Sequence, residues 1–192
     1  MGESEFLFQG IDLKPGLVAD LRRMNPWWEG NPAPPNPPHR RDVVDQINRR
    51  LAAAIAPIIV VRGPRQVGKS TAQLQVIDGL LKSGVPVRNV FRVQFDDLAE
   101  LGGLGSEPIL RLVDWYERAV LGQTINAVAR AGGKVYLLLD EVQNLAGWDV
   151  QLKFLVDTTA IQVILTGGST PGTEVGRGVA GRINTLEVDR RD

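Results

Sequence analysis

Apolar residues follow two kinds of pattern along this chain, and the two kinds alternate. Short, continuous apolar runs such as 58–61 and 135–139 are typical of β-strands that are covered on both faces. Apolar residues spaced three and four positions apart are typical of helices. Together they predict strands over 58–62, 90–95, 135–139, 162–166 and 183–188, and helices over 42–56, from just after residue 70 to about 82, over 107–130 and over 150–157. Alternating strands and helices predict an α/β fold built from parallel βαβ units with right-handed crossovers.

The first part of the chain has a different composition. Five prolines lie between residues 31 and 38, and such a stretch favours an extended backbone and excludes a helix. The adjacent Trp27 and Trp28 are large apolar groups that need cover. We therefore predict a proline-rich tail over residues 1–41 that packs on or near a core domain over residues 42–192.

Composition excludes several kinds of site. The chain of 192 residues has no cysteine and one histidine, His39, so it holds neither a disulfide framework nor a cluster of cysteine or histidine ligands. The formal net charge is zero, which gives no electrostatic reason for the whole domain to bind nucleic acid. No apolar stretch approaches the ~20 residues of a membrane helix, and no signal peptide is visible. We expect a cytoplasmic protein without a membrane partner.

One segment carries the strongest candidate chemistry. Residues 63–70 fit the P-loop pattern G-x-x-x-x-G-K-[ST], and they lie between a predicted strand and a predicted helix. In that setting backbone N–H groups surround a phosphate, and the helix N-terminus adds a positive dipole. Lys69 would reach the β- and γ-phosphates of a nucleotide, and the Ser70 hydroxyl would bind Mg²⁺. The candidate nucleotide-binding residues are Gly63, Pro64, Arg65, Gln66, Val67, Gly68, Lys69, Ser70 and Thr71.

A second candidate segment is the apolar run 135–139, which ends in two carboxylates, Asp140 and Glu141. In a fold with this phosphate-binding loop, Asp140 would support the Mg²⁺ shell beside Ser70. Glu141 would orient and polarise an attacking water. The alternative is an ordinary acidic pair at the start of a loop.

Two further candidates lie nearer the end of the chain. The strand 162–166 ends in small polar residues, where Thr166 is the first candidate for sensing a γ-phosphate and Ser169 the second. The alternative is a turn whose hydroxyls cap backbone groups. Arg177 and Arg182 lie among glycines. Either could act as an arginine finger on the nucleotide of a neighbouring subunit, with Arg182 favoured, or form a surface salt bridge.

The sequence resembles a family of predicted bacterial and archaeal AAA-type P-loop ATPases. The resemblance rests on Gly63–Thr71, Phe95–Asp97, Asp140–Gln143, Leu165–Ser169 and Ala180–Arg182, and on the similar segment Asn25–Trp28. It implies a three-layer P-loop NTPase fold with a parallel five-stranded sheet of order 5-1-4-3-2, an ATP-binding core and Mg²⁺-dependent hydrolysis. Gly168 stands where the family usually has serine. The family continues into a helical lid and a C-terminal domain, which are missing from this sequence, so we expect a fragment or a truncated product.

These features predict an ATP-binding protein that hydrolyses ATP with Mg²⁺. The catalytic candidates are Glu141, Lys69, Thr166 and Arg182, and the metal ligands are Ser70 and Asp140. The alternative is a nucleotide-dependent switch that binds ATP with little turnover and controls a partner. A GTPase is disfavoured because no Asn-Lys-x-Asp motif occurs, and a small-molecule kinase because adjacent carboxylates favour water as the nucleophile. An arginine finger would require a homo-oligomer, and a nucleic-acid or protein partner stays open.

Overall fold

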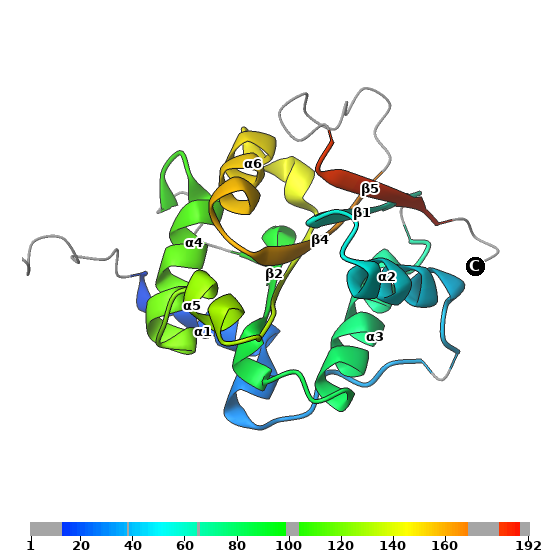
Figure 1. Ribbon diagram of the computed structural model, residues 1–192, viewed down its shortest axis with the longest axis horizontal. Coiled ribbons are helices and arrows are strands. Elements are labelled where there is room, and N and C mark those ends of the chain that lie inside the picture. The colour runs from blue at the N-terminus through cyan, green and yellow to red at the C-terminus, as the bar shows by residue number, and fades with distance from the viewer. Residues whose placement is uncertain (1–12, 38, 65, 99–103, 169–180, 189–192) are drawn as a thin grey trace, which may run out of the picture.

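Five parallel strands form one sheet in the computed structural model, which describes residues 13–37, 39–64, 66–98, 104–168 and 181–188 (Figure 1). The strands are β1 (Ile58–Gly63), β2 (Val90–Gln94), β3 (Val135–Asp140), β4 (Ile161–Gly168) and β5 (Ile183–Glu187), in the spatial order β2-β3-β4-β1-β5. Read from the other edge, this is the predicted order 5-1-4-3-2. The predicted α/β fold of the P-loop NTPase type is therefore confirmed.

The alternation of side chains along the central strands explains why the sheet is buried on both faces. In β1, Ile58 and Val60 belong to one apolar cluster, and Ile59 and Val61 belong to the other. Each of these side chains is at most 6% exposed. Burying such a side chain contributes about 1.5–3 kcal/mol, so the layers on both faces stabilise the sheet.

Helices form those two covering layers. One face carries α1 (Pro15–Met24), α4 (Pro108–Tyr116), α5 (Ile125–Arg130) and α6 (Trp148–Thr158), whose apolar residues share one core cluster. The other face carries α2 (Asp42–Ala53) and α3 (Lys69–Lys82), and Figure 1 shows these two helices side by side. Short helical turns connect these elements at η2 (Pro26–Glu29), η3 (Val87–Asn89), η4 (Phe95–Asp97) and η7 (Val142–Asn144), and a π-helical turn, η6 (Glu117–Leu121), follows α4.

The single helix predicted over 107–130 is wrong, because the chain forms two helices there. The π-helical turn ends at Gly122, whose φ of 68° is left-handed and suits glycine. The next helix, α5, begins at Ile125, and the hydroxyl of its N-cap residue Thr124 accepts the N–H of Ala127 at 3.2 Å. The Glu117 carboxylate also accepts the N–H of Ile125 at 2.6 Å. These caps bind backbone groups that a continuous helix would have used.

The segment predicted as a tail contains a helix that the sequence reading missed. Helix α1 places Leu17, Leu21 and Met24 in the core cluster on the face of the sheet that α4, α5 and α6 also cover. The next residues run along the outer edge of β2, where the side chain of Asn25 donates to the carbonyl of Arg92 at 2.8 Å and accepts its N–H at 2.7 Å. These bonds take the place of a further strand, and an uncovered edge is an aggregation hazard.

The two tryptophans complete this cover. Trp27 and Trp28 both donate from their indole N–H groups to the carbonyl of Val90, at 3.0 and 2.9 Å. Trp28 also packs on the rings of Phe91 and Tyr116, with centroids 5.4 and 5.9 Å away. Their apolar bodies are therefore covered while their polar edges bind the backbone of β2.

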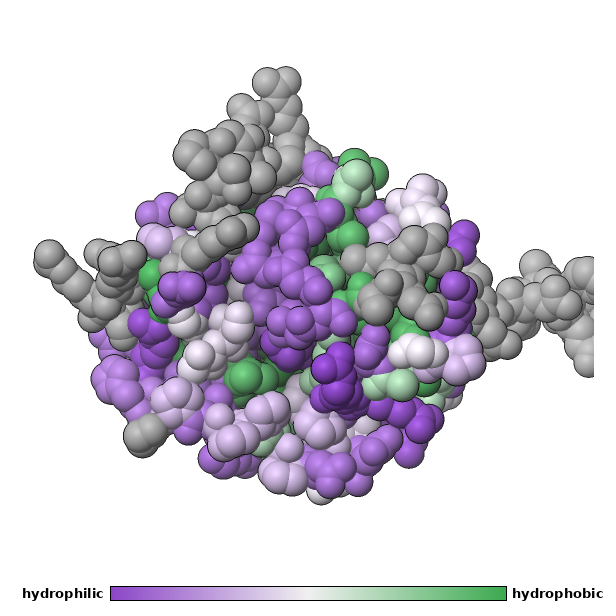
Figure 2. Space-filling view, turned by 180° about the vertical axis from the view of Figure 1, so that it is seen from behind, coloured by the Kyte–Doolittle hydropathy of each residue, from purple (hydrophilic) through white to green (hydrophobic). Residues whose placement is uncertain are grey.

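The surface of the described residues carries few large apolar side chains. Ile55, Val87, Val150 and Phe154 are the exposed ones. Figure 2 shows mostly hydrophilic residues on the side of the molecule that faces away from the viewer in Figure 1. None of the described helices has both the length and the apolar character needed to cross a bilayer.

Candidate functional site

The candidate phosphate-binding loop joins the carboxyl end of β1 to the first turn of α3. Its backbone turns left-handed at Gln66, with φ 62°, and at Gly68, with φ 86°. Alternation of this kind directs successive N–H groups to one side, which makes an anion-binding concavity. Gln66 holds this conformation without being a glycine, which costs on the order of 1–3 kcal/mol. Arg65, another residue of this loop, lies outside the described residues.

The lysine of the loop is drawn inward. The Lys69 ammonium donates to the carbonyl of Gly63 at 3.0 Å and to that of Pro64 at 2.8 Å, and the side chain is buried. Ser70 and Thr71 follow on α3, and Ser70 is exposed. The positive charge thus lies within the loop, beside the N–H groups that would face a phosphate.

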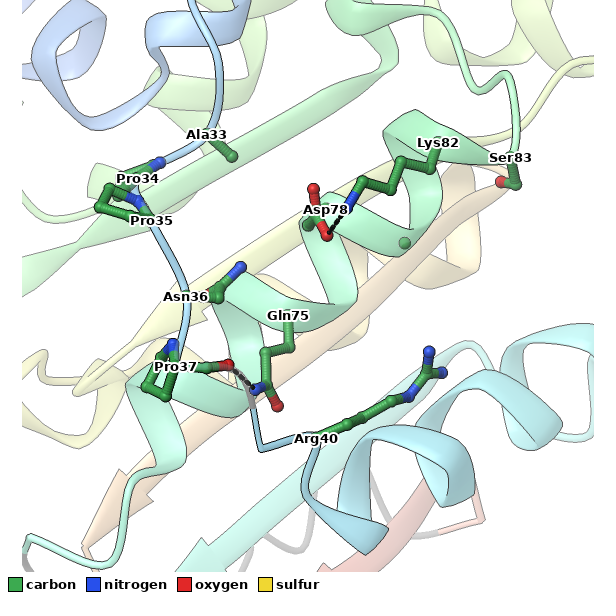
Figure 3. A pocket seen from close by; sticks show the side chains of 11 residues that line it. Ala33, Pro34, Pro35, Asn36, Pro37, Arg40, Gln75, Asp78, Lys82 and Ser83 are labelled. Carbon is green, nitrogen blue, oxygen red and sulfur yellow. Dashed lines mark hydrogen bonds and ion pairs between the residues drawn. The ribbon is translucent and has the colours of Figure 1, made fainter.

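An arginine from outside the motif also contacts the loop. Arg41, which precedes α2, donates from its guanidinium to the carbonyl of Val67 and lies against Gly68. Gln75 of α3 positions it by accepting the N–H of Arg41 at 3.3 Å and by donating to the carbonyl of His39 at 2.7 Å. A groove of about 760 Å³ lies alongside, between α3 and the proline-rich segment 33–37. Figure 3 shows Gln75 reaching across to that segment.

The carboxylate at the end of β3 is buried and only partly hydrogen-bonded. Asp140 is 1% exposed. Its Oδ1 accepts the hydroxyl of Thr166 at 2.5 Å, because Asp140 and Thr166 are partners in the β3–β4 register. Its Oδ2 has no hydrogen-bond partner. A buried carboxylate oxygen of this kind suits a metal ion or a metal-bound water.

A buried arginine stands beside that carboxylate. Nη2 of Arg92 lies 3.7 Å from Oδ2 of Asp140. The guanidinium also donates to Gln73 of α3 at 3.0 Å and to Gln94 at 2.7 Å. Gln73 in turn donates to the hydroxyl of Thr166 at 3.3 Å. Loss of solvent lowers the pKa of Arg92, and the charges of Asp140 and Asp97 oppose this effect.

The second acidic residue, Glu141, is held by its neighbours. Its φ of 55° is left-handed, and its N–H donates to the carbonyl of Thr166 at 2.9 Å. Its carboxylate accepts a hydrogen bond from the side-chain amide of Gln143, and the side chain of Gln143 lies against Gly167. Strained backbone that is fixed from several sides is characteristic of functional sites.

The phosphate-binding loop and Glu141 line one cleft. A space of about 510 Å³ is lined by Gln66, Gly68, Lys69, Ser70, Thr71, Asp96 and Glu141. The structure therefore brings the loop and Glu141 together. Asp140 and Thr166 are buried and are not among the lining residues, whereas Asp96, which follows β2, is one of them. Within the described residues no group of three or more acidic or histidine side chains could hold a metal by itself. A Mg²⁺ that shares phosphate ligands needs fewer protein ligands, and Ser70 with the free oxygen of Asp140 fits that need.

Arg182 does not join this cleft. It precedes the amino end of β5, and its carbonyl accepts the N–H of Ile58, the first residue of β1. The loop follows the carboxyl end of β1, whereas Arg182 lies beside the amino ends of β1 and β5. Arg182 is therefore at the opposite end of these parallel strands from the loop. There it forms an ion pair with Asp157 of α6. Its role as an arginine finger on another subunit stays a prediction. Ser169 and Arg177 lie outside the described residues.

Sequence reasoning missed Arg92 and Gln73. The available signals were a charge in the middle of an otherwise apolar strand and a polar residue on the inner face of α3. Both patterns are equally typical of exposed positions. Their burial follows only from the way that α3 packs on the sheet, where it contacts β1 and β4 and bonds to Arg92 of β2.

Comparison with known proteins is consistent with this geometry. A family model described as an AAA domain matches residues 56–189. No curated protein matches the sequence. Among solved structures, PCH-2 of C. elegans is similar over 76% of this chain and 40% of that chain, with 13% sequence identity and a TM-score of 0.47. The chain thus spans less than half the length of that protein, and so distant a likeness carries no argument about activity.

Proposed function

The chain belongs to this AAA domain family of nucleotide-binding, ATPase-type domains, and from that premise we propose that it binds ATP together with Mg²⁺ and hydrolyses the ATP. The observation that carries the proposal is the cleft in which the phosphate-binding loop and Glu141 face the same space. The loop supplies positive charge and N–H donors, and Glu141 supplies a carboxylate for the attacking water.

Each residue has a separate task in this proposal. The N–H groups from Gln66 to Ser70 bind the phosphates, and the Lys69 ammonium exchanges its loop carbonyls for phosphate oxygens. The Ser70 hydroxyl and the Asp140 carboxylate would hold Mg²⁺, which would neutralise negative charge on the phosphates. Thr166 fixes the Asp140 carboxylate, so Thr166 responds to the nucleotide through Asp140.

The carboxylate of Glu141 orients the water. Gln143 holds one of its oxygens, which leaves the other oxygen to accept a proton from water in line with the γ-phosphate. A water placed by this side chain would attack the γ-phosphorus and give its proton to Glu141, and ADP would leave with its negative charge balanced by Lys69.

The same contact supports a second candidate, a switch that binds ATP with little turnover. While the Gln143 amide occupies Glu141, that carboxylate has less capacity to activate water. Arg182, paired with Asp157, adds no positive charge to the cleft of its own chain. In this alternative, bound ATP would change the contacts of the protein with a partner.

Calorimetric titration with Mg·ATP and with Mg·GTP tests the proposal, with phosphate release followed on the same samples. The variants are Lys69→Ala and a matched control, Lys82→Ala, which removes a lysine paired with Asp78 at the other end of α3. We expect ATP binding by the wild type and by Lys82→Ala, and at least about tenfold weaker binding by Lys69→Ala. Turnover would then separate enzyme from switch, and a wild type that binds no ATP would refute both.

A further inference from the structure

Arg92 is a charged residue in a place that normally excludes charge. It lies in the middle of β2, it is 7% exposed, and its apolar neighbours along the strand, Phe91 and Val93, are fully buried. A buried charge is costly unless it is paired and hydrogen-bonded. The proposed nucleotide chemistry has no use for this cation, so its presence needs a reason.

Arg92 makes hydrogen bonds to two glutamines and a charge–charge interaction with Asp140. Gln73 and Gln94 hold the guanidinium by accepting hydrogen bonds at 3.0 and 2.7 Å. The distance to Oδ2 of Asp140, 3.7 Å, is too long for a hydrogen bond. Arg92 therefore compensates the charge of this carboxylate without occupying the oxygen that faces it.

We propose that Arg92 is the internal counter-ion of Asp140, which balances this buried carboxylate until a magnesium ion takes over part of that role. This inference rests on the proposed function, in which Asp140 helps to hold Mg²⁺. Arg92 is a positioning residue, because it touches neither the nucleotide nor the metal in this scheme. The two glutamines hold its guanidinium away from Asp140, so that the buried Oδ2 of Asp140 stays without a hydrogen-bond partner.

The arrangement explains several features together. A buried Asp140 carboxylate without a nearby positive charge would destabilise the fold. An arginine that was hydrogen-bonded to both oxygens of Asp140 would instead compete directly with the metal. Asp97, at the end of η4, is the other acidic group that acts on Arg92, but it is exposed. Gln73 lies on α3, which begins at Lys69 of the phosphate-binding loop, so the bond from Arg92 to Gln73 ties the counter-ion to that helix. Gln73 also donates to Thr166 on β4.

The inference makes two opposite predictions for Arg92→Met. Without metal the variant loses stability, because Asp140 is left buried and unbalanced. With a nucleotide present the variant binds Mg²⁺ more tightly, because a repelling positive charge has been removed from the neighbourhood of the metal. A purely structural arginine would lower stability and would leave the affinity for Mg²⁺ unchanged.

The first measurement is a double-mutant cycle in EDTA with no nucleotide. The urea midpoints of the wild type, Arg92→Met, Asp140→Asn and the double variant are compared on the full chain. We expect Arg92→Met to lower the midpoint clearly and Asp140→Asn to restore much of that loss when it is added. Strictly additive effects would overturn the counter-ion pairing.

The second measurement is a Mg²⁺ titration at a saturating concentration of a non-hydrolysable ATP analogue, read out as the rise in thermal unfolding temperature. We expect the half-saturating Mg²⁺ concentration of Arg92→Met to fall by at least about tenfold relative to the wild type, as the removal of one nearby charge predicts. Arg92→Lys, which keeps the charge, and Arg88→Met, which removes an exposed arginine, should both resemble the wild type.

The outcomes separate this inference from the proposed function. A wild type that responds to Mg²⁺, together with an unchanged half-saturation in Arg92→Met, would overturn the counter-ion role alone. A wild type that does not respond to Mg²⁺ and the analogue would overturn both. If Arg92→Met does not fold, Arg92→Lys combined with Asp140→Asn carries the stability cycle. A lysine that stays coupled to Asp140 supports the pairing, and additivity refutes it.

Discussion

The side-chain amide of Gln143 donates a hydrogen bond to the carboxylate of Glu141, two residues earlier in the chain. The same side chain lies so close to Gly167 that a Cβ on this glycine would collide with it. Gln143 thus connects the acidic residue after β3 to the end of β4. The contact gives the Asp-Glu-x-Gln motif a physical role beyond its two carboxylates.

Removing the amide should therefore affect turnover more than binding. For Gln143→Ala we expect about 10- to 100-fold slower phosphate release, because the Glu141 carboxylate loses its fixed orientation. The affinity for ATP should stay within about threefold, since the phosphate-binding loop is untouched. Parallel calorimetry and phosphate-release measurements decide this. Faster release would instead indicate that Gln143 restrains Glu141, as the switch alternative requires.

Two glycines near or within α3 should respond oppositely to the same substitution. Gly68 has φ 86°, and a Cβ there would collide with the guanidinium of Arg41. We expect Gly68→Ala to lower the free energy of unfolding by about 1–2 kcal/mol from the backbone alone and to weaken nucleotide binding. Gly79, inside α3, has open space around it, so Gly79→Ala should raise stability by about 0.5–1 kcal/mol. Urea unfolding of the two variants tests this pair, and equal effects would contradict it.

The edge of β2 should become exposed when Asn25 is replaced. Asn25 is buried, and its side chain makes three hydrogen bonds, two of them to the backbone of Arg92. We expect Asn25→Ala to cost about 1–3 kcal/mol of unfolding free energy through unsatisfied backbone groups. It should also promote concentration-dependent association, measured by light scattering. Asn31→Ala, at an exposed position of the same segment, is the control and should do neither.

The pair of Asp157 and Arg182 can be tested by pH. The hydrogen bond from Arg182 is the main reason that the pKa of Asp157 lies below its ordinary value of 3.8, and Lys153 adds to the effect. A carboxylate with a depressed folded-state pKa stabilises the fold above its unfolded pKa and loses that contribution as the pH falls through the folded value. An NMR titration of the Asp157 carboxyl carbon should therefore give a midpoint below 3.8 in the wild type.

The matched variant for that titration is Arg182→Ala. Its midpoint for Asp157 should move back up toward the ordinary value, with a smaller residual shift left by Lys153. An identical midpoint in both proteins would mean that the two side chains do not pair in solution. In that case Arg182 would be free to act elsewhere, including on a neighbouring subunit.

Local patterns predicted the parts of the molecule that local chemistry determines. The loop 63–71 stands out in the sequence because its glycines and lysine lie close together and follow an apolar run, and the structure places it between β1 and α3. The five strands were predicted within a few residues for the same reason. By contrast, the prolines between 31 and 38 predict a tail, and the helical spacing of Leu17, Leu21 and Met24, which form α1, is easily overlooked beside them.

The network around Asp140 could not be predicted in this way. Gln73 and Thr166 are 93 residues apart in sequence, and no local sequence pattern indicates that the two side chains are in contact. Their contact depends on the crossing of α3 over β4, which packing of the whole apolar layer determines. The burial of Arg92 is equally hard to predict, because an arginine in an edge strand is usually expected to point into solvent.

The cover over β2 also bears on how the chain is made. The bonds that join Asn25, Trp27 and Trp28 to β2 span 62 to 67 residues of sequence. A ribosome releases residues 25–28 well before it releases β2, so these residues have no binding partner until β2 emerges. Strand β2 in turn needs β3 to pair with. Residues 25–28 are thus made before β2 but packed after it, and Trp27 and Trp28 stay exposed on the nascent chain during that interval.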